Sequence, residues 1–172
     1  MTRYTDLAAL RRNISPDVRI IDDHQPPAYR LTQAKPVTAV TTPTEHEEQA
    51  ALFAWAAAME GQYPELGLLF AIPNGGARHP AVAAMLKAEG VRAGVPDCFL
   101  PAPRPDRAGN GRTWHGLFLE LKRADHSGHP SPVQRDWLER LRAQGYLCIV
   151  AYGADEAISA ISYYLGMEET QP

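Results

Sequence analysis

Three charged residues lie in or beside apolar segments where charge is not expected. Asp97 stands at the head of the apolar run in GVPDCFLP (94–101), and Glu120 and Lys122 stand two residues apart inside LFLELKR (117–123). Side chains alternate between the two faces of a strand, so Glu120 and Lys122 share a face. Because an isolated charge is costly to bury, these residues need either partners of opposite charge or a function at that place.

The types of these residues suit the hydrolysis of a phosphate diester. If the two segments pair as neighbouring strands, Asp97 and Glu120 come onto one face, where two carboxylates repel each other unless a cation lies between them. Magnesium prefers oxygen ligands, polarises a phosphoryl oxygen and lowers the pKa of its bound water. A lysine beside it can orient or deprotonate that water, or stabilise the negative charge that develops. The sequence therefore predicts a metal-assisted phosphodiester hydrolase.

The hydrophobic periodicity of the core predicts which elements hold these residues. Apolar residues at helical spacing predict a first helix after Thr44, and the pattern S-P-x-Q predicts a later helix with Ser131 as its cap. The expected order is a helix within 42–61, a strand at 66–72, a helix at 80–89, strands at 98–103 and 114–123, a helix at 131–145, a strand at 146–152 and a helix at 155–165. This order predicts an α/β fold with a mixed central sheet flanked by helices.

The composition of the whole chain is that of an ordinary soluble protein. Its 172 residues, of which 45% are hydrophobic and 22% charged, suit one domain with a full core. Residues 1–41, whose second half is rich in Pro and Thr, are expected to form an extended or mobile arm, and residues 42–172 the domain. No apolar run is long enough to span a membrane and the N-terminus lacks the apolar core of a signal peptide, so we expect a soluble intracellular protein.

Charge is unevenly distributed along the chain. The net charge of −3 argues against a protein that coats nucleic acid. Residues 74–142 nevertheless carry eleven Lys and Arg against seven Asp and Glu, a net charge of +4, and the unusual acids lie in this segment. A polyanionic partner at this segment and a scatter of ordinary surface charges are equally compatible with these numbers.

Several short motifs occur together in one order. The first helix is rich in glutamate (45–48), and it is followed by PNGG (73–76), AGVPD (93–97), ELK (120–122) and SPVQ (131–134). In this combination the chain resembles the VRR-NUC family, a branch of the PD-(D/E)XK nuclease superfamily. The resemblance extends from Thr44 to Leu165, over essentially the whole core. An Asp followed by Glu-x-Lys is common by chance, so the resemblance depends on the full set of motifs.

The resemblance implies a restriction-endonuclease-like fold and a metal-dependent DNA nuclease. By this resemblance Asp97 and Glu120 are the carboxylates that bind Mg²⁺ or Mn²⁺, and the backbone carbonyl of Leu121 is an additional ligand. Lys122 is implied to be the catalytic lysine. Gln134 matches a glutamine of the family on the helix after the Glu-x-Lys strand, and it is implied to position the attacking water or Lys122.

Further residues and properties are implied by the same resemblance. One glutamate of the first helix is expected to join the site, and Glu45 or Glu48 is favoured because both share a face with Leu52. Asn74 and Arg78 are implied as DNA contacts. Family members cut DNA, often at flaps or at branched junctions of the Holliday type, and the stand-alone forms tend to be homodimers. We therefore expect a DNA-cleaving homodimer in the cytoplasm of a bacterium or a phage-infected cell.

Each of these residues also has a purely structural interpretation. Ser131 and Gln134 form the capping-box pattern S-x-x-Q, which accounts for Gln134 without any chemistry. Glutamates can cap the first helix in the same way, and Asp97 can close a turn. His126 and His129 have the spacing H-x-x-H, but no cysteine lies near them in the sequence, so exposed loop histidines are favoured over a zinc site.

Two other functions fit part of the pattern. A catalytically silent DNA-binding module would use the same fold, although degenerate nucleases usually lose an acid or the lysine, and this chain keeps Asp97, Glu120 and Lys122. A hydrolase of small phosphate compounds would use the same residues, but it would cleave nucleotides and leave plasmid or oligonucleotide DNA intact. Substrate and metal dependence separate these hypotheses.

Overall fold

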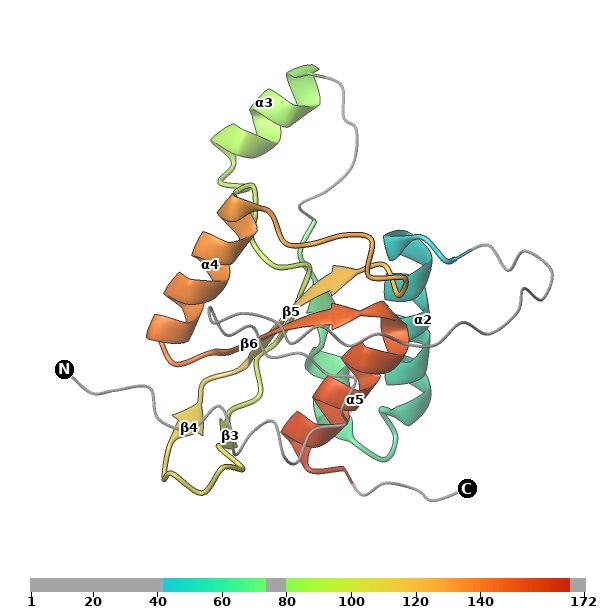
Figure 1. Ribbon diagram of the computed structural model, residues 1–172, viewed down its shortest axis with the longest axis vertical. Coiled ribbons are helices and arrows are strands. Elements are labelled where there is room, and N and C mark those ends of the chain that lie inside the picture. The colour runs from blue at the N-terminus through green and yellow to red at the C-terminus, as the bar shows by residue number, and fades with distance from the viewer. Residues whose placement is uncertain (1–41, 74–79, 168–172) are drawn as a thin grey trace, which may run out of the picture.

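A four-stranded mixed sheet organises residues 42–73 and 80–167, the part of the chain that the computed structural model describes (Figure 1). The strands lie in the order β1 (Phe70–Ala71), β2 (Cys98–Leu100), β5 (Leu117–Lys122) and β6 (Leu147–Tyr152). The β1–β2 and β2–β5 pairs are antiparallel, and the β5–β6 pair is parallel. The prediction of an α/β fold with a mixed central sheet is confirmed.

The described residues form four α-helices, three of which pack against this sheet. The four are α2 (Glu45–Met59), α3 (Pro80–Ala88), α4 (Pro132–Ala143) and α5 (Gly153–Leu165). Helices α2 and α5 lie together on one side of the sheet and α4 lies on the other, while α3 projects away from the sheet (Figure 1). None of these helices is long and apolar enough to cross a membrane.

Strand β5 is buried on both of its faces because helices cover both sides of the sheet. Leu117, Leu119 and Leu121 belong to one core cluster, which residues of α2 and α5 complete. Phe118 points to the opposite face, where it packs in a second cluster with Leu138 of α4. All six residues of β5 are buried, so the charged residues within it lie inside the protein.

The prediction of a strand at 66–72 is wrong over most of its length. The apolar run 66–72 predicts one buried strand, but Pro64–Leu68 form a 3₁₀ helix and only Phe70–Ala71 form a strand, at the exposed edge of the sheet. Leu66 and Leu69 are both buried, and the three-residue turn of a 3₁₀ helix places residues three apart on one side. A short apolar run does not distinguish this period from the alternation of a strand.

The segment between β2 and β5 contains a small second sheet where the sequence predicts only a loop. β3 (Arg104–Pro105) pairs antiparallel with β4 (Thr113–Trp114). The strand predicted at 114–123 is consequently interrupted at Gly116, which is buried against β2: a Cβ at this position would lie 2.7 Å from the ring of Phe99. The hairpin ends where the central strand β5 begins.

The turn before β2 packs directly against the start of α4. Gly94 has a φ of 82°, and a Cβ there would lie 2.6 Å from Val133 Cγ1 and 3.2 Å from the backbone nitrogen of Gln134. The indole nitrogen of Trp137 donates a hydrogen bond of 3.0 Å to the carbonyl of Ala93. Glycine is required here for both conformation and space, and the contact fixes the point at which β2 begins.

Replacement of Gly94 by alanine is expected to lower the free energy of unfolding by about 2–3 kcal/mol, because it adds a clash with the Val133 side chain and tight contacts with the backbone of α4 to a left-handed conformation. Gly90 is a matched control, since its φ is 100° but no atom lies within 4 Å of its Cβ position. Gly90→Ala should cost only about 1 kcal/mol. Urea unfolding of both variants measures the difference, and equal losses would contradict the close packing of the turn on α4.

Candidate active site

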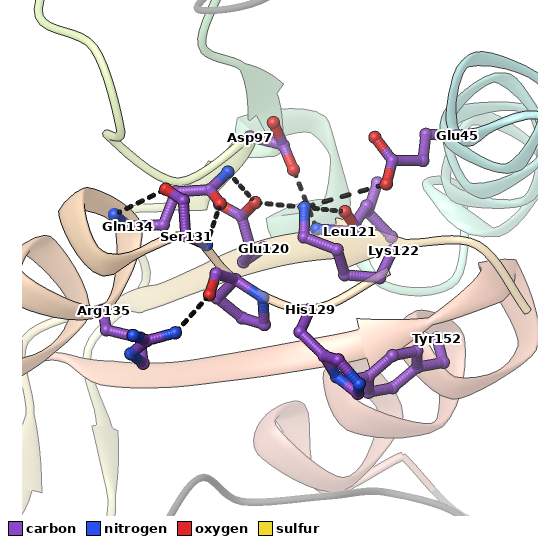
Figure 2. A network of polar contacts seen from close by, with 11 residues as sticks. Glu45, Asp97, Glu120, Leu121, Lys122, His129, Ser131, Gln134, Arg135 and Tyr152 are labelled. Carbon is purple, nitrogen blue, oxygen red and sulfur yellow. Dashed lines mark hydrogen bonds and ion pairs between the residues drawn. The ribbon is translucent and has the colours of Figure 1, made fainter. Parts of the chain in front are cut away.

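The register of the sheet brings the two acids opposite each other. Cys98 pairs with Leu119 in the antiparallel β2–β5 ladder, so the next pair in the same register is Asp97 and Glu120. The backbone nitrogen of Leu121 donates a hydrogen bond of 2.8 Å to Asp97 Oδ2 (Figure 2). The carboxylate that precedes β2 is therefore oriented by the backbone of β5, on the face that carries Glu120.

Lys122 lies at the centre of a group of oxygen atoms. Its ammonium nitrogen is 2.5 Å from Glu120 Oε1, 2.8 Å from the carbonyl oxygen of Leu121 and 3.8 Å from Glu45 Oε1 (Figure 2). The side chains of Glu120 and Lys122 are both buried. The two charges that the sequence places on one face are thus partners inside the protein.

Gln134 fills its structural and its site role at the same time. Its backbone nitrogen donates to Ser131 Oγ at 3.3 Å, and its side-chain oxygen accepts from the backbone nitrogen of Ser131 at 2.8 Å, which completes the capping box of α4. The amide nitrogen of the same side chain donates to Glu120 Oε1. The cap therefore orients the glutamine toward the buried acid.

The glutamates of the first turn of α2 have three different partners. Glu47 forms a capping box with Thr44. Glu45 reaches Lys122, whereas Glu48 Oε2 accepts a hydrogen bond of 2.8 Å from the backbone nitrogen of Ala154, at the start of α5. Of the two glutamates that the sequence favours, the structure brings only Glu45 to the site.

Some predicted positions fall outside the residues that the structure describes. Asn74 and Arg78, implied as DNA contacts, belong to the segment 74–79, and the predicted arm of residues 1–41 is also outside. Conversely, the structure places Tyr152 beside Lys122 in the β5–β6 register, and sequence reasoning did not single it out. The signal for Tyr152 was its place at the end of the apolar run 146–152, next to the predicted strand of Lys122.

The burial of three charges perturbs their pKa values. Burial raises the pKa of Glu120 to about 7, and the charge of Asp97 adds to this rise. Burial also raises the pKa of Asp97 above its ordinary value. For Lys122, burial lowers the pKa, but the hydrogen bond and charge of Glu120, with the charges of Glu45 and Asp97, outweigh it and the pKa is raised. Lys122 is therefore an ammonium ion at neutral pH.

The residues present fit a hard divalent cation. Glu120 Oε2 is buried and has no hydrogen-bond partner in the part of the chain that the structure describes, and it lies on the face that Asp97 shares. No group of three His, Cys, Asp or Glu side chains suited to a metal ion occurs within residues 42–73 and 80–167. Asp97 and Glu120 would supply two carboxylates. Two carboxylates, a backbone carbonyl and water are a donor set that Mg²⁺ and Mn²⁺ accept.

Comparison with known proteins agrees with this geometry. The model of the VRR-NUC domain matches residues 32–155, which is more than half of the chain. The chain belongs to the VRR-NUC family. A solved structure described as a VRR_NUC domain protein shares 28% sequence identity with this VRR-NUC chain, with a TM-score of 0.59 over 74% of this chain and 93% of that chain. No curated protein matches the chain. The family and the mixed sheet together are consistent with the predicted restriction-endonuclease-like fold.

The contact between Gln134 and Glu120 is testable with Gln134→Glu, which keeps the capping box but replaces an amide donor by a second carboxylate. An acid whose pKa is raised by folding destabilises the folded protein as the pH rises through that pKa. The new carboxylate of Gln134→Glu raises the pKa of Glu120 further. Unfolding free energies should match the wild type within about 0.5 kcal/mol at pH 5 and fall about 2 kcal/mol below it at pH 8. Equal stability at both pH values would contradict the contact.

Proposed function

We propose that this VRR-NUC protein is a metal-dependent nuclease that hydrolyses phosphodiester bonds in DNA. The observation that carries the proposal is the convergence of Asp97, Glu120 and Lys122 on one face of the sheet, in a nuclease family. Two opposed carboxylates, one with a buried oxygen that lacks a hydrogen-bond partner among the described residues, call for a cation, and the neighbouring ammonium calls for an anionic substrate.

Asp97, Glu120 and the carbonyl of Leu121 would hold Mg²⁺ or Mn²⁺. A bound ion of this kind polarises a phosphoryl oxygen and lowers the pKa of a coordinated water. The protein contributes the orientation of its ligands: the backbone of β5 holds Asp97, and the amide of Gln134 holds one oxygen of Glu120. The other oxygen of Glu120 remains for the ion.

Lys122 acts as a positive charge in this mechanism. Its raised pKa keeps it protonated, which argues against a role as general base and favours stabilisation of the negative charge that develops on the phosphate. Glu45 and Glu120 hold the ammonium from two sides. Glu45 is accordingly a positioning residue for Lys122 in this proposal.

We further propose that the enzyme acts on flap or branched DNA and works as a homodimer. The resemblance to nucleases of this kind supports the substrate, and the net charge of −3 favours weak binding to plain duplex. For the dimer, support comes from helix α3, which projects from the sheet (Figure 1). The apolar side chains of Val82 and Met85 on this helix are exposed.

A catalytically silent DNA-binding module is the alternative. Such a module has no need to bury charged groups opposite one another, and replacement of both the acid and the lysine by apolar residues of similar volume is often neutral or stabilising for a core. The chain instead keeps Glu120 and Lys122 fully or nearly buried, with Gln134 bonded to Glu120. This retained set favours the enzyme.

Cleavage of labelled single-stranded, duplex, flap and four-way-junction DNA tests the proposal, in Mg²⁺, in Mn²⁺ and in EDTA. The wild type should cut DNA in Mg²⁺ or Mn²⁺ but not in EDTA, and it should cut flap or junction substrates fastest. Asp97→Asn, Glu120→Gln and Lys122→Met should each lower the rate at least about 100-fold, because each removes charge from the site. Full activity in any of the three would contradict the site.

Matched controls separate loss of chemistry from loss of folding or binding. Glu48 lies on α2 like Glu45, but its carboxylate contacts the start of α5 and not the site. The variant Glu48→Gln should therefore cut DNA at the wild-type rate. Urea unfolding and DNA binding in EDTA should be measured for every variant. A wild type that binds DNA but cuts none of these substrates would favour the silent module.

The affinity for the metal should depend on pH in the absence of DNA. A proton on Glu120 competes with the ion, and burial raises the pKa of this group to about 7. The apparent dissociation constant for Mn²⁺ should therefore rise by up to about tenfold for each pH unit below 7 and change little above 8. Titration calorimetry measures it, and an affinity that is constant between pH 5.5 and 8 would contradict the role of Glu120 as a ligand.

A further inference from the structure

The loop between β5 and α4, residues 123–131, passes over the side chain of Lys122. A Cβ placed on Gly128 would lie 3.5 Å from Lys122 Cδ and 3.8 Å from Glu45 Oε1. The loop at Gly128 thus runs beside the aliphatic stem that carries the ammonium, separated from it by about the space of one methyl group. Whatever fixes this loop also limits where Lys122 can move.

Tyr152 lies on the sheet beside Lys122. The two residues end β6 and β5 and pair with each other in the parallel register, so their side chains project from the same face. Tyr152 is 8% exposed and belongs to the core cluster on the face that α4 covers. Its ring offers the loop a rigid surface next to the catalytic lysine.

Two histidines hold the loop on this surface, one on either side of Gly128 in the sequence. His129 Nδ1 lies 3.2 Å from the hydroxyl oxygen of Tyr152 (Figure 2). The ring of His126 packs against the phenol ring, with 4.3 Å between the centroids. The H-x-x-H spacing thus serves a shared contact with one tyrosine.

The backbone of His126 adopts a conformation that these contacts must enforce. Its φ is 57°, and it is the one residue other than glycine with a positive φ in the described part of the chain. This conformation is costly for a residue that has a Cβ, and it persists where surrounding contacts determine it. Here it accompanies the packing of the imidazole on Tyr152, and the nitrogen Nε2 lies 4.0 Å from Glu156 Oε1.

We propose that Tyr152, together with His126 and His129, positions Lys122 by holding the loop 123–131 against its side chain. The role of Lys122 in catalysis rests on the proposed function, but the restraint on Lys122 does not. The stem of lysine has four rotatable bonds, and its ordering is entropically costly. The loop supplies the packing that keeps the ammonium near Glu120.

Chemical reactivity of Lys122 tests this restraint without metal or DNA. The other lysines of the chain are Lys35 and Lys87, and Lys87 is exposed on α3 while Lys122 is 6% exposed. An N-hydroxysuccinimide ester of acetic acid should label Lys87 fast and Lys122 slowly, as mass spectrometry of peptides would measure. Tyr152→Phe and His129→Ala should each raise the rate at Lys122 about three- to tenfold and leave that at Lys87 unchanged.

The control is His115→Ala. This histidine also packs against a tyrosine, Tyr146, but it lies before β5, at the opposite end of the strand from Lys122. It should leave the labelling of Lys122 unchanged, and urea unfolding should show that all variants are folded at the labelling temperature. Wild-type labelling rates at Lys122 in both Tyr152→Phe and His129→Ala would overturn the inference.

DNA cleavage supplies a second readout that a merely structural role would not move. Tyr152→Phe and His129→Ala should lower kcat about three- to tenfold with KM unchanged, and the double variant should be no slower than either single one. His129→Asn, which keeps a polar group near the Nδ1 position, should restore most of kcat. If kcat falls and KM rises by equal factors in these variants, the inference that Tyr152 and His129 position Lys122 is contradicted. A wild type that cuts no DNA, with the labelling changes present, would overturn the proposed function alone.

Discussion

The burial of a carboxylate inside the core is the constraint on which the rest of the site depends. Glu120 lies in the central strand between two covered faces, and burial raises its pKa from 4.5 to about 7, which corresponds to about 3 kcal/mol. Such a group requires partners, and each neighbour supplies one: the ammonium of Lys122 and the amide of Gln134 share one oxygen. The second oxygen has no hydrogen-bond partner among residues 42–73 and 80–167, and it is the place that a cation would fill.

Two packing contacts convert this local chemistry into a site of fixed shape. The turn at Gly94 lies against the first turn of α4, so the start of β2 and the side chain of Gln134 are placed by one contact. The opposite boundary is the loop after β5, which rests on Tyr152 and passes beside Lys122 at Gly128. The sheet register then needs only to bring Asp97 opposite Glu120.

The residues of the centre were predictable because they follow from short-range rules. Alternation along a strand placed Glu120 and Lys122 on one face, and the capping pattern placed Gln134 at the start of α4. Long-range packing was not predictable in the same way. Glu45 and Glu48 are three residues apart on one helix face, and only the docking of α5 gives Glu48 a different partner. The contacts of His126 and His129 with Tyr152 depend likewise on the parallel pairing of β5 with β6, which no local pattern specifies.

We propose that Asp97, Glu120 and the carbonyl of Leu121 form one cation site. Anomalous diffraction from a crystal soaked in Mn²⁺ tests it most directly, because the position of the ion is observed without any assay of activity. A single strong peak bounded by these three groups, and missing in Glu120→Gln, is the result we predict. Wild-type crystals with no peak there, or with manganese bound only elsewhere, would contradict the account.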